Sequence, residues 1–200
     1  MAKLDFFYEF ASTYSYPAAM RIDDLALDYD VEVNWRPFLL GPVFKAQGWE
    51  TSPFNIYPEK GRYMIRDLER ICEADGLPLF RMPKTFPAYS ILPARVALCF
   101  TGELRAAFSR AVYDAEFAGG ADISDTKVIG KILRMLGEDA AKLFEKVNTQ
   151  PVKDLLRNET EAARKHGIFG APAFVTADGE LFWGNDRLEM AMEWAAKNGV

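Results

Sequence analysis

The sequence is poor in the residues that bind metals or form disulfides. It has two cysteines and one histidine among 200 residues. Cys72 and Cys99 fit neither the spacing of a redox pair nor that of a zinc site, and both lie in apolar helical patterns typical of buried, unreactive thiols. A single histidine, His166, disfavours a Ser-His-Asp triad and a multi-histidine metal site. We therefore expect no metal centre and assign His166 no chemistry.

The chain also lacks the charge and the apolar runs that nucleic acid or a membrane would require. Its net charge is -5, whereas phosphate binding needs clustered Lys and Arg. No stretch approaches the roughly 20 apolar residues that cross a bilayer. The apolar segment 4–10 is interrupted by Asp5 and Glu9 and has no basic leader, unlike a signal peptide. We predict a cytoplasmic protein that binds neither nucleic acid nor a membrane.

The periodicity of apolar residues predicts a strand–helix–strand start. Aromatic side chains alternate with others over 3–10, and apolar residues alternate with polar ones over 31–39, as is typical of strands. Between them, residues 16–28 carry apolar side chains at helical spacing, and Ser12 or Ser15 can cap that helix. Two strands joined by a helix need a crossover connection and therefore pair in parallel.

The middle of the chain predicts a long loop and then a series of helices. Residues 41–57 are rich in Gly, Pro and aromatic residues and show no clear period. Long loops of this kind are often functional. The helices that follow are expected at about 60–75, 89–100, 103–118, 125–136, 138–146 and 151–166.

The C-terminal part returns to strands around Asp178-Gly179, a strong hairpin signal. The strands are expected at 173–177 and 180–183, and a last helix at 186–197. The order of elements is then βαβ, several helices and αββα. We therefore predict an α/β chain with a thioredoxin-like fold and a large all-helical insertion. Residues 1–45 and 148–200 would form the thioredoxin-like domain, and residues 46–147 the loop and the helical insertion.

Ser12 and Ser15 stand before the first predicted helix, where a thiol-handling fold would carry two cysteines in C-x-x-C spacing. The simplest role for Ser12 is to cap the helix through its hydroxyl. The same position also suits catalysis, because a helix N-terminus carries partial positive charge that stabilises a docked thiolate. Lowering a thiol pKa by one unit takes only about 1.4 kcal/mol. The two roles are compatible, and they favour a protein that uses the sulfur of a bound thiol.

A proline loop, Phe169-Gly170-Ala171-Pro172, precedes the predicted hairpin. It can be an ordinary turn. If the bond between Ala171 and Pro172 is cis, the backbone of Ala171 is instead exposed and fixed, and it can pair with a peptide-like ligand as a short added strand. The position of this loop in a chain with a βαβ start favours the cis form.

The segment Trp183-Gly184-Asn185-Asp186 ends the hairpin. Asn185 or Asp186 can cap the last helix. The same helix start offers N–H groups to a carboxylate, and the Asp186 carboxylate can accept from an α-amino group. The segment therefore suits the zwitterionic end of an amino acid.

Three further polar residues lie on or near the predicted long loop, namely Arg36, Lys45 and Asn55. Most lysines are solvated surface residues, and this is the simplest account of Lys45. In a chain of net negative charge, however, an anionic substrate needs a local cation. Lys45 and Arg36 are the candidates for that cation.

These motifs together resemble the thioredoxin-like family of 2-hydroxychromene-2-carboxylate isomerases and kappa-class glutathione transferases. The resemblance covers essentially the whole chain and is carried by the segments 5–12, 36–41, 44–45, 63–68, 169–172 and 183–188. It implies a glutathione-dependent, homodimeric enzyme that acts on a small aromatic carboxylate, as in the degradation of naphthalene and related compounds.

The resemblance also implies a role for each matching residue. Ser12 matches a catalytic serine that contacts the glutathione sulfur. Residues with further implied roles are Ala171 and Pro172 at the cis-proline, Trp183, Gly184, Asn185 and Asp186 around the γ-glutamyl end, Asn55 in the cleft between domains, and Lys45 at the substrate carboxylate. Members of the family often have proline after the serine, where this chain has Thr13.

The implied reaction interconverts 2-hydroxychromene-2-carboxylate and trans-o-hydroxybenzylidenepyruvate. A thiolate that adds reversibly to the conjugated double bond allows it to rotate and then leaves, so glutathione is not consumed. Two alternatives stay open: a kappa-like transferase or peroxidase that consumes glutathione, and a non-catalytic module that binds glutathione or another thiol. A dithiol oxidoreductase is disfavoured, because neither Ser12 nor Ser15 can form a disulfide.

Overall fold

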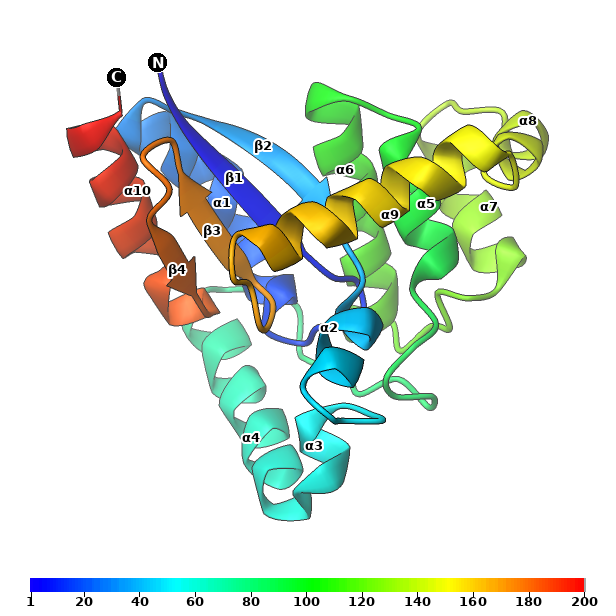
Figure 1. Cartoon of the computed structure of the whole chain (residues 1–200). Coiled ribbons are helices and arrows are strands. Elements are labelled where there is room, and N and C mark those ends of the chain that lie inside the picture. Colours follow the sequence, from blue (N-terminus) through cyan, green and yellow to red (C-terminus); the bar gives the residue numbers. More distant parts are fainter. Residues whose placement is uncertain (200) are drawn as a thin grey trace.

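The computed structural model describes residues 1–199 and contains a four-stranded mixed sheet in the order β2-β1-β3-β4 (Figure 1). The strands are β1 (Ala2–Tyr8), β2 (Val31–Pro37), β3 (Ala173–Thr176) and β4 (Leu181–Trp183). β1 pairs in parallel with β2 and antiparallel with β3, and β3 pairs antiparallel with β4. The predicted parallel start and C-terminal hairpin are thus confirmed, although β1 and β2 each end two residues earlier than predicted.

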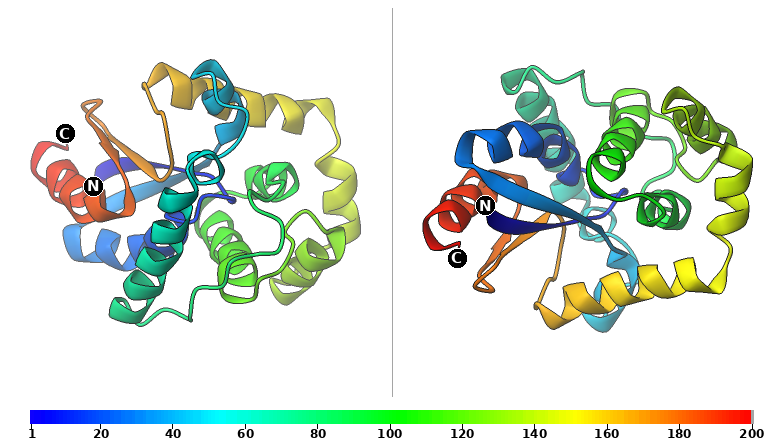
Figure 2. Two further views of the ribbon diagram at one scale, coloured as in Figure 1. Left: turned by 90° about the horizontal axis from the view of Figure 1, so that it is seen from below. Right: turned by 90° about the horizontal axis from the view of Figure 1, so that it is seen from above.

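Alternating side chains of β1 divide the core into two layers. Phe6 and Tyr8 pack in the cluster that contains α1 (Ser15–Tyr29) and α10 (Leu188–Asn198). Phe7 belongs to a second cluster with Ala163 of α9 (Gln150–Lys165). Figure 2 shows α9 on the opposite side of the sheet from α1 and α10. Each of the three fully buried aromatic side chains contributes roughly 1.5–3 kcal/mol to the thioredoxin-like core.

The segment between β2 and α9 is helical. Its elements are α2 (Leu40–Ala46), α3 (Pro53–Ile56), α4 (Pro58–Ala74), α5 (Ile91–Leu98), α6 (Gly102–Tyr113), the π-helix η1 (Asp114–Ala118), α7 (Thr126–Met135) and α8 (Ala140–Lys146). The predicted all-helical insertion is therefore present. One buried cluster includes side chains of the sheet and of these helices, so the two parts share a core. The division of the chain at residues 46 and 147 stays a prediction.

The prediction of a long loop over 41–57 is wrong, because α2 and α3 interrupt it. Leu40 and Val43 of α2 are buried in the cluster that α9 joins. α3 begins at Pro53, and the Ser52 hydroxyl accepts a hydrogen bond from the N–H of Phe54 at 3.3 Å. Helices of four and seven residues have too few turns to show a period in the sequence.

Candidate functional site

A cleft of about 1270 Å³ lies at one edge of the sheet, and residues of α3 and α4 are part of its lining. The edge is formed by the C-terminal ends of β1, β2 and β4 and by the N-terminal end of β3. Its walls come from α4 and from the segments 9–14, 39–54, 85–91, 169–171 and 183–186. The topology thereby brings together the loop after β1 and the proline loop, which are about 160 residues apart in the sequence.

Ser12 lies on the floor of this cleft and its hydroxyl is tied to the proline loop. Its Oγ donates to the carbonyl oxygen of Ala171 at 2.8 Å, and its N–H donates to the carbonyl oxygen of Glu9 at 3.0 Å. The prediction that Ser12 or Ser15 caps the first helix is wrong. α1 begins at Ser15, and Tyr14 precedes it without a side-chain cap. The Ser12 hydroxyl is therefore free of any capping role and faces the cleft.

The proline loop has the conformation that the sequence favoured. The bond between Ala171 and Pro172 is cis. The Ala171 backbone lines the cleft beside Ser12, while Pro172 is buried behind it and is not part of the lining. A second cis bond, between Phe86 and Pro87, also lies in the cleft lining and was not foreseen.

The segment 183–186 lines the cleft, but it does not cap the last helix in the predicted way. Asn185 and Asp186 belong to a short 3-10 helix, η2 (Asn185–Arg187), which precedes α10, and neither side chain caps it. Gly184 has φ 108, a conformation that favours glycine, and it turns the chain from β4 into η2. The side chain of Asn185 accepts from Arg21 of α1 at 3.2 Å. Arg21 therefore fixes the orientation of Asn185 at the cleft.

The indole of Trp183 forms part of the cleft rim with the proline loop. Its ring lies 4.9 Å from the ring of Phe169, and both side chains are about half exposed. A Cβ atom on Gly170 would lie 2.5 Å from Trp183 Nε1. Glycine at this position therefore allows the loop and the indole to pack directly against each other.

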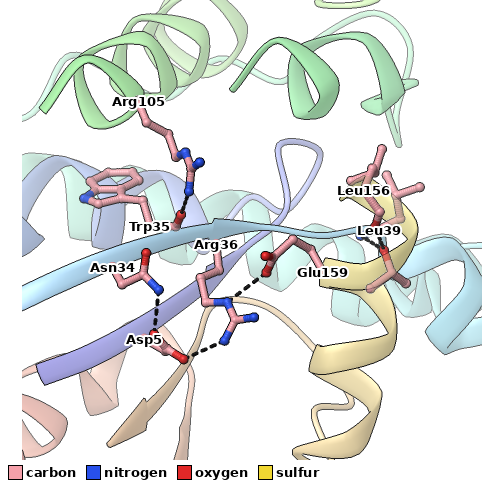
Figure 3. A network of polar contacts seen from close by, with 9 residues as sticks. Asp5, Asn34, Trp35, Arg36, Leu39, Arg105, Leu156 and Glu159 are labelled. Carbon is pink, nitrogen blue, oxygen red and sulfur yellow. Dashed lines mark hydrogen bonds and ion pairs between the residues drawn. The ribbon is translucent and has the colours of Figure 1, made fainter. Parts of the chain in front are cut away.

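Arg36 does not line the cleft, so its role in binding a substrate stays a prediction. Its guanidinium forms ion pairs with Asp5 of β1 at 2.6 Å and with Glu159 of α9 at 2.8 Å (Figure 3). It also lies over the Phe7 ring, with Cζ 4.5 Å from the centroid. These partners join the sheet to α9 and leave Arg36 outside the cleft lining.

Lys45 and Asn55 also lie outside the lining of the cleft. Lys45 is exposed near the end of α2. The Asn55 amide donates to Thr51 Oγ1 at 3.2 Å and to the carbonyl oxygen of Phe86 at 3.3 Å. Asn55 thus connects two segments that line the cleft. The sequence analysis instead expected the side chains of Lys45 and Asn55 to line the cleft themselves.

Lys60 is the basic side chain that lines the cleft, where the sequence analysis expected Lys45. It extends from α4 into the cleft lining, and its Nζ lies 4.9 Å from the centroid of the Tyr57 ring. It is the only Lys or Arg among the lining residues, all of which fall within 1–199. The cleft therefore offers an anion a single positive side chain, which Lys60 places on the wall formed by α4.

Two hydrogen bonds hold α4 to the segment 9–14, which contains Ser12 and is called the serine turn below. The Tyr14 hydroxyl donates to Asp67 Oδ2 at 2.8 Å, and burial followed by this acidic neighbour raises the pKa of Tyr14. Thr13 Oγ1 donates to the sulfur of Met64 at 3.0 Å. Thr13 therefore helps to fix α4 against the site.

Glu9 is a site residue that the sequence analysis missed. It follows β1, is only 4 % exposed and lines the cleft. Its Oε1 accepts a hydrogen bond from the hydroxyl of Ser90. Burial raises the pKa of Glu9 to about 7, although the Ser90 hydrogen bond opposes the shift. The sequence did contain a signal for its burial, because Glu9 stands between two large aromatic residues, Tyr8 and Phe10. Both of these are buried in the structure.

The remaining candidates for metal or thiol chemistry lie away from this site. Burial raises the pKa of the Cys72 thiol to about 11, as the prediction of an unreactive cysteine requires. The ring of His166, after α9, lies 5.7 Å from that of Phe7. Within residues 1–199 no group of three or more His, Cys, Asp or Glu side chains is placed to hold a metal ion. In the same range no helix is long and apolar enough to span a bilayer.

The mixed sheet, the turn after β1 and the facing cis-proline loop define a thioredoxin-like protein with serines in place of the redox cysteines. The chain belongs to the family of DSBA-like thioredoxin domains, which matches it over residues 3–193.

Known proteins of similar sequence and structure include isomerases and transferases. The chain is 31% identical to 2-hydroxychromene-2-carboxylate isomerase of Sphingobium xenophagum, over 93% of this chain and 94% of that protein. It is 28% identical to human glutathione S-transferase kappa 1, over 94% of this chain and 88% of that protein. A solved 2-hydroxychromene-2-carboxylate isomerase superposes with a TM-score of 0.87 at 26% identity, covering 98% of this chain and 95% of the other.

Proposed function

We propose that the protein is a glutathione-dependent isomerase that interconverts 2-hydroxychromene-2-carboxylate and trans-o-hydroxybenzylidenepyruvate, or close aromatic analogues. The observation that carries the proposal is the hydroxyl of Ser12, which donates to the carbonyl of Ala171 on the floor of the cleft. The similarity to isomerases of this name over more than nine-tenths of the chain supports it.

The residues of the cleft fit a tripeptide thiol. The volume of about 1270 Å³ exceeds the ~300–1,000 Å³ of typical ligand pockets, so it can hold a tripeptide and an aromatic substrate together. The Ala171 backbone at the cis-proline loop would pair with the peptide, as a short added strand. Trp183, Asn185 and Asp186 would hold the γ-glutamyl end. Asn55 would contribute by keeping the walls of the cleft together.

The hydroxyl of Ser12 has one proton and two acceptors that compete for it. It now donates to the Ala171 carbonyl, and a bound sulfur would accept the same proton. The carbonyl of Ala171 would then be available to accept an N–H of the bound peptide. Ser12 thus couples peptide binding to stabilisation of the thiolate, which requires only rotation of its hydroxyl.

Bound glutathione supplies a thiolate that adds reversibly to a conjugated double bond, which can then rotate. Lys60 orients the substrate by pairing with its carboxylate. The mainly aromatic and apolar residues on the walls, such as Phe44, Trp49 and Phe54, contact the flat ring and exclude water from it. Acidic residues elsewhere in the lining, among them Glu50 and Asp67, repel the substrate carboxylate. They therefore disfavour its binding at any position away from Lys60.

Replacing Lys60 by methionine should raise KM for the carboxylate substrate about tenfold and change kcat less. The loss corresponds to about 1.4 kcal/mol, near the lower bound for a hydrogen bond to a charged group, because Lys60 is exposed to solvent. Steady-state kinetics measure both constants. Lys45→Met is the matched control, since Lys45 lies outside the cleft. A larger rise in KM for Lys45→Met than for Lys60→Met would show that Lys45, and not Lys60, binds the substrate carboxylate.

A spectrophotometric assay of 2-hydroxychromene-2-carboxylate with and without glutathione tests the proposed function. The protein is first freed of small thiols by gel filtration. We expect turnover only after glutathione is added, with the concentration of free thiol unchanged during the reaction. Equal turnover in the absence of glutathione would refute the proposal.

A kappa-like glutathione transferase is the second candidate, because human glutathione S-transferase kappa 1 is almost as similar to the chain as the isomerases are. The same residues would bind glutathione. Stoichiometric loss of free thiol during turnover would identify a transferase. Binding of glutathione without either reaction would identify a non-catalytic module. The homodimer stays a prediction that sedimentation can test.

A further inference from the structure

Two buried carboxyl groups lie behind the serine turn, and the proposed function uses neither. Glu9 lines the cleft, and Glu116 of the π-helix η1 is fully buried. Neither carboxylate oxygen of Glu116 has a hydrogen-bond partner among the described residues. π-helical turns occur frequently at functional sites. A carboxyl group that is buried beside a cleft is ordinarily kept neutral, so it can act as an acid.

The groups around Glu9 are hydroxyls, the backbone N–H of Ala11, whose hydrogen bond lowers the Glu9 pKa, and a second acid. Ser90, before α5, donates to its carboxyl group. Tyr113 of α6 donates to its backbone carbonyl at 2.9 Å, and the pKa of Tyr113 is itself raised by burial and by the nearby Glu9. Glu116 of η1 is close enough that the charge of Glu9 raises its pKa further. None of these neighbours is a cation, so only the hydrogen bonds from Ser90 and Ala11 stabilise Glu9 when it ionises.

We propose that Glu9 is the catalytic acid–base group that protonates the carbonyl oxygen of the substrate when sulfur adds to the conjugated double bond. The inference rests on the proposed function for the sulfur addition. Protonation of the carbonyl oxygen is not performed by Ser12 or Lys60, because Ser12 stabilises the thiolate and Lys60 binds the substrate carboxylate.

The step is balanced without any further reactant. As the carbon–sulfur bond forms, the π electrons of the double bond move to the conjugated carbonyl oxygen. The Glu9 O–H bond breaks, its proton passes to that oxygen, and Glu9 is left as a carboxylate that Ser90 stabilises. After rotation about the new single bond, Glu9 takes the proton back, the carbonyl re-forms and the carbon–sulfur bond breaks. An acid with a pKa near the working pH is the most effective one for such a transfer.

Glu9→Gln tests the assignment, because glutamine keeps the shape of the protonated side chain and cannot release a proton. We expect the variant to bind glutathione as the wild type does, measured by calorimetry. The rates of isomerisation and of glutathione addition to an aryl enone should fall about 100-fold, the lower bound for general acid catalysis. Conjugation with a chlorodinitrobenzene should change less than threefold, because no carbonyl oxygen is protonated in that reaction. Equal losses in both classes of reaction, or in neither, would overturn the assignment.

Infrared spectroscopy tests the same group without turnover. The wild-type spectrum minus that of Glu9→Gln should contain the carbonyl stretch of a protonated carboxyl at about pH 5, and this band should disappear by about pH 8. Absence of the band at about pH 5 would overturn the role of Glu9 alone. A wild-type protein that shows the band and binds glutathione, but catalyses none of the reactions, would overturn the proposed function and the role of Glu9 with it.

Discussion

Ser12→Ala should lower the rate of glutathione-dependent isomerisation about 100-fold while leaving the fold intact. Removing one preorganised donor from a developing anion typically lowers kcat by about 10² to 10³. The Ser12 hydroxyl is such a donor, because it is held at the cleft floor by its hydrogen bond to Ala171. Alanine removes the donor without disturbing α1, since Ser12 does not cap that helix.

The pKa of the bound thiol separates this role from a structural one. Loss of the donor should raise the pKa of bound glutathione by about one unit, which the ultraviolet absorbance of the thiolate reports as a function of pH. Ser15→Ala is the matched control, because the Ser15 side chain is buried and does not line the cleft. Ser15→Ala should keep both the thiol pKa and the rate. Near-wild-type turnover by Ser12→Ala with glutathione present would refute the role of Ser12.

The parts of the fold that the sequence predicted are those with a strong local signal. Aromatic alternation in β1 places Phe6 and Phe7 in different core clusters, as a period of two requires. Asp178-Gly179 predicted the hairpin, and Gly179 has φ 89 in the turn between β3 and β4. The long loop was a wrong prediction because the stability of α2 comes from Leu40 and Val43 packing near α9, which is a tertiary effect.

The parts of the site that could be predicted are those with a local sequence motif, such as the turn after β1 and the proline loop. Side chains that reach the cleft from a distant element could not be predicted. Ser12 and Ala171 were found because serines stand in C-x-x-C spacing after the first strand and a proline loop precedes the hairpin, and the structure joins the two by a hydrogen bond. Lys60 looks like any exposed lysine in the sequence, and only the path of α4 brings it to the cleft. The ion pairing of Arg36 could not be predicted, because its partner Glu159 lies on a helix more than 120 residues away.

Glu9 was missed because a single carboxyl residue in an alternating strand pattern predicts solvent exposure. The structure ends β1 at Tyr8, so Glu9 begins the turn, and the turn carries its side chain inward beside Ser90. Its burial has a second, measurable consequence for the whole protein, because a carboxyl group whose pKa is raised by folding makes stability depend on pH.

Glu9 alone should lower the free energy of unfolding by about 2.5 kcal/mol between about pH 5 and pH 8, a loss of roughly 70-fold in the folding equilibrium. Glu9 keeps its proton up to about pH 7 when folded, against an ordinary pKa of 4.5. Between these values the folded state binds more protons than the unfolded chain does, so raising the pH favours unfolding. Glu116 acts in the same direction, since burial and then the charge of Glu9 raise its pKa well above the ordinary value.

Urea unfolding across this range measures the effect, and two variants assign it. Glu9→Gln should remove the part of the decrease that Glu9 contributes, because glutamine does not titrate, and should leave the part that comes from Glu116. Glu116→Gln should remove the other part, because the folded protein keeps the Glu116 proton at pH values where the unfolded chain has already released it. The exposed Asp122, Asp139 and Asp178 do not interfere, since hydrogen bonds lower their pKa values and they lose stabilisation only in more acidic solution. A wild-type stability that stays constant or rises from about pH 5 to pH 8 would contradict a protonated Glu9, because a buried carboxyl that ionises in the folded protein must destabilise it.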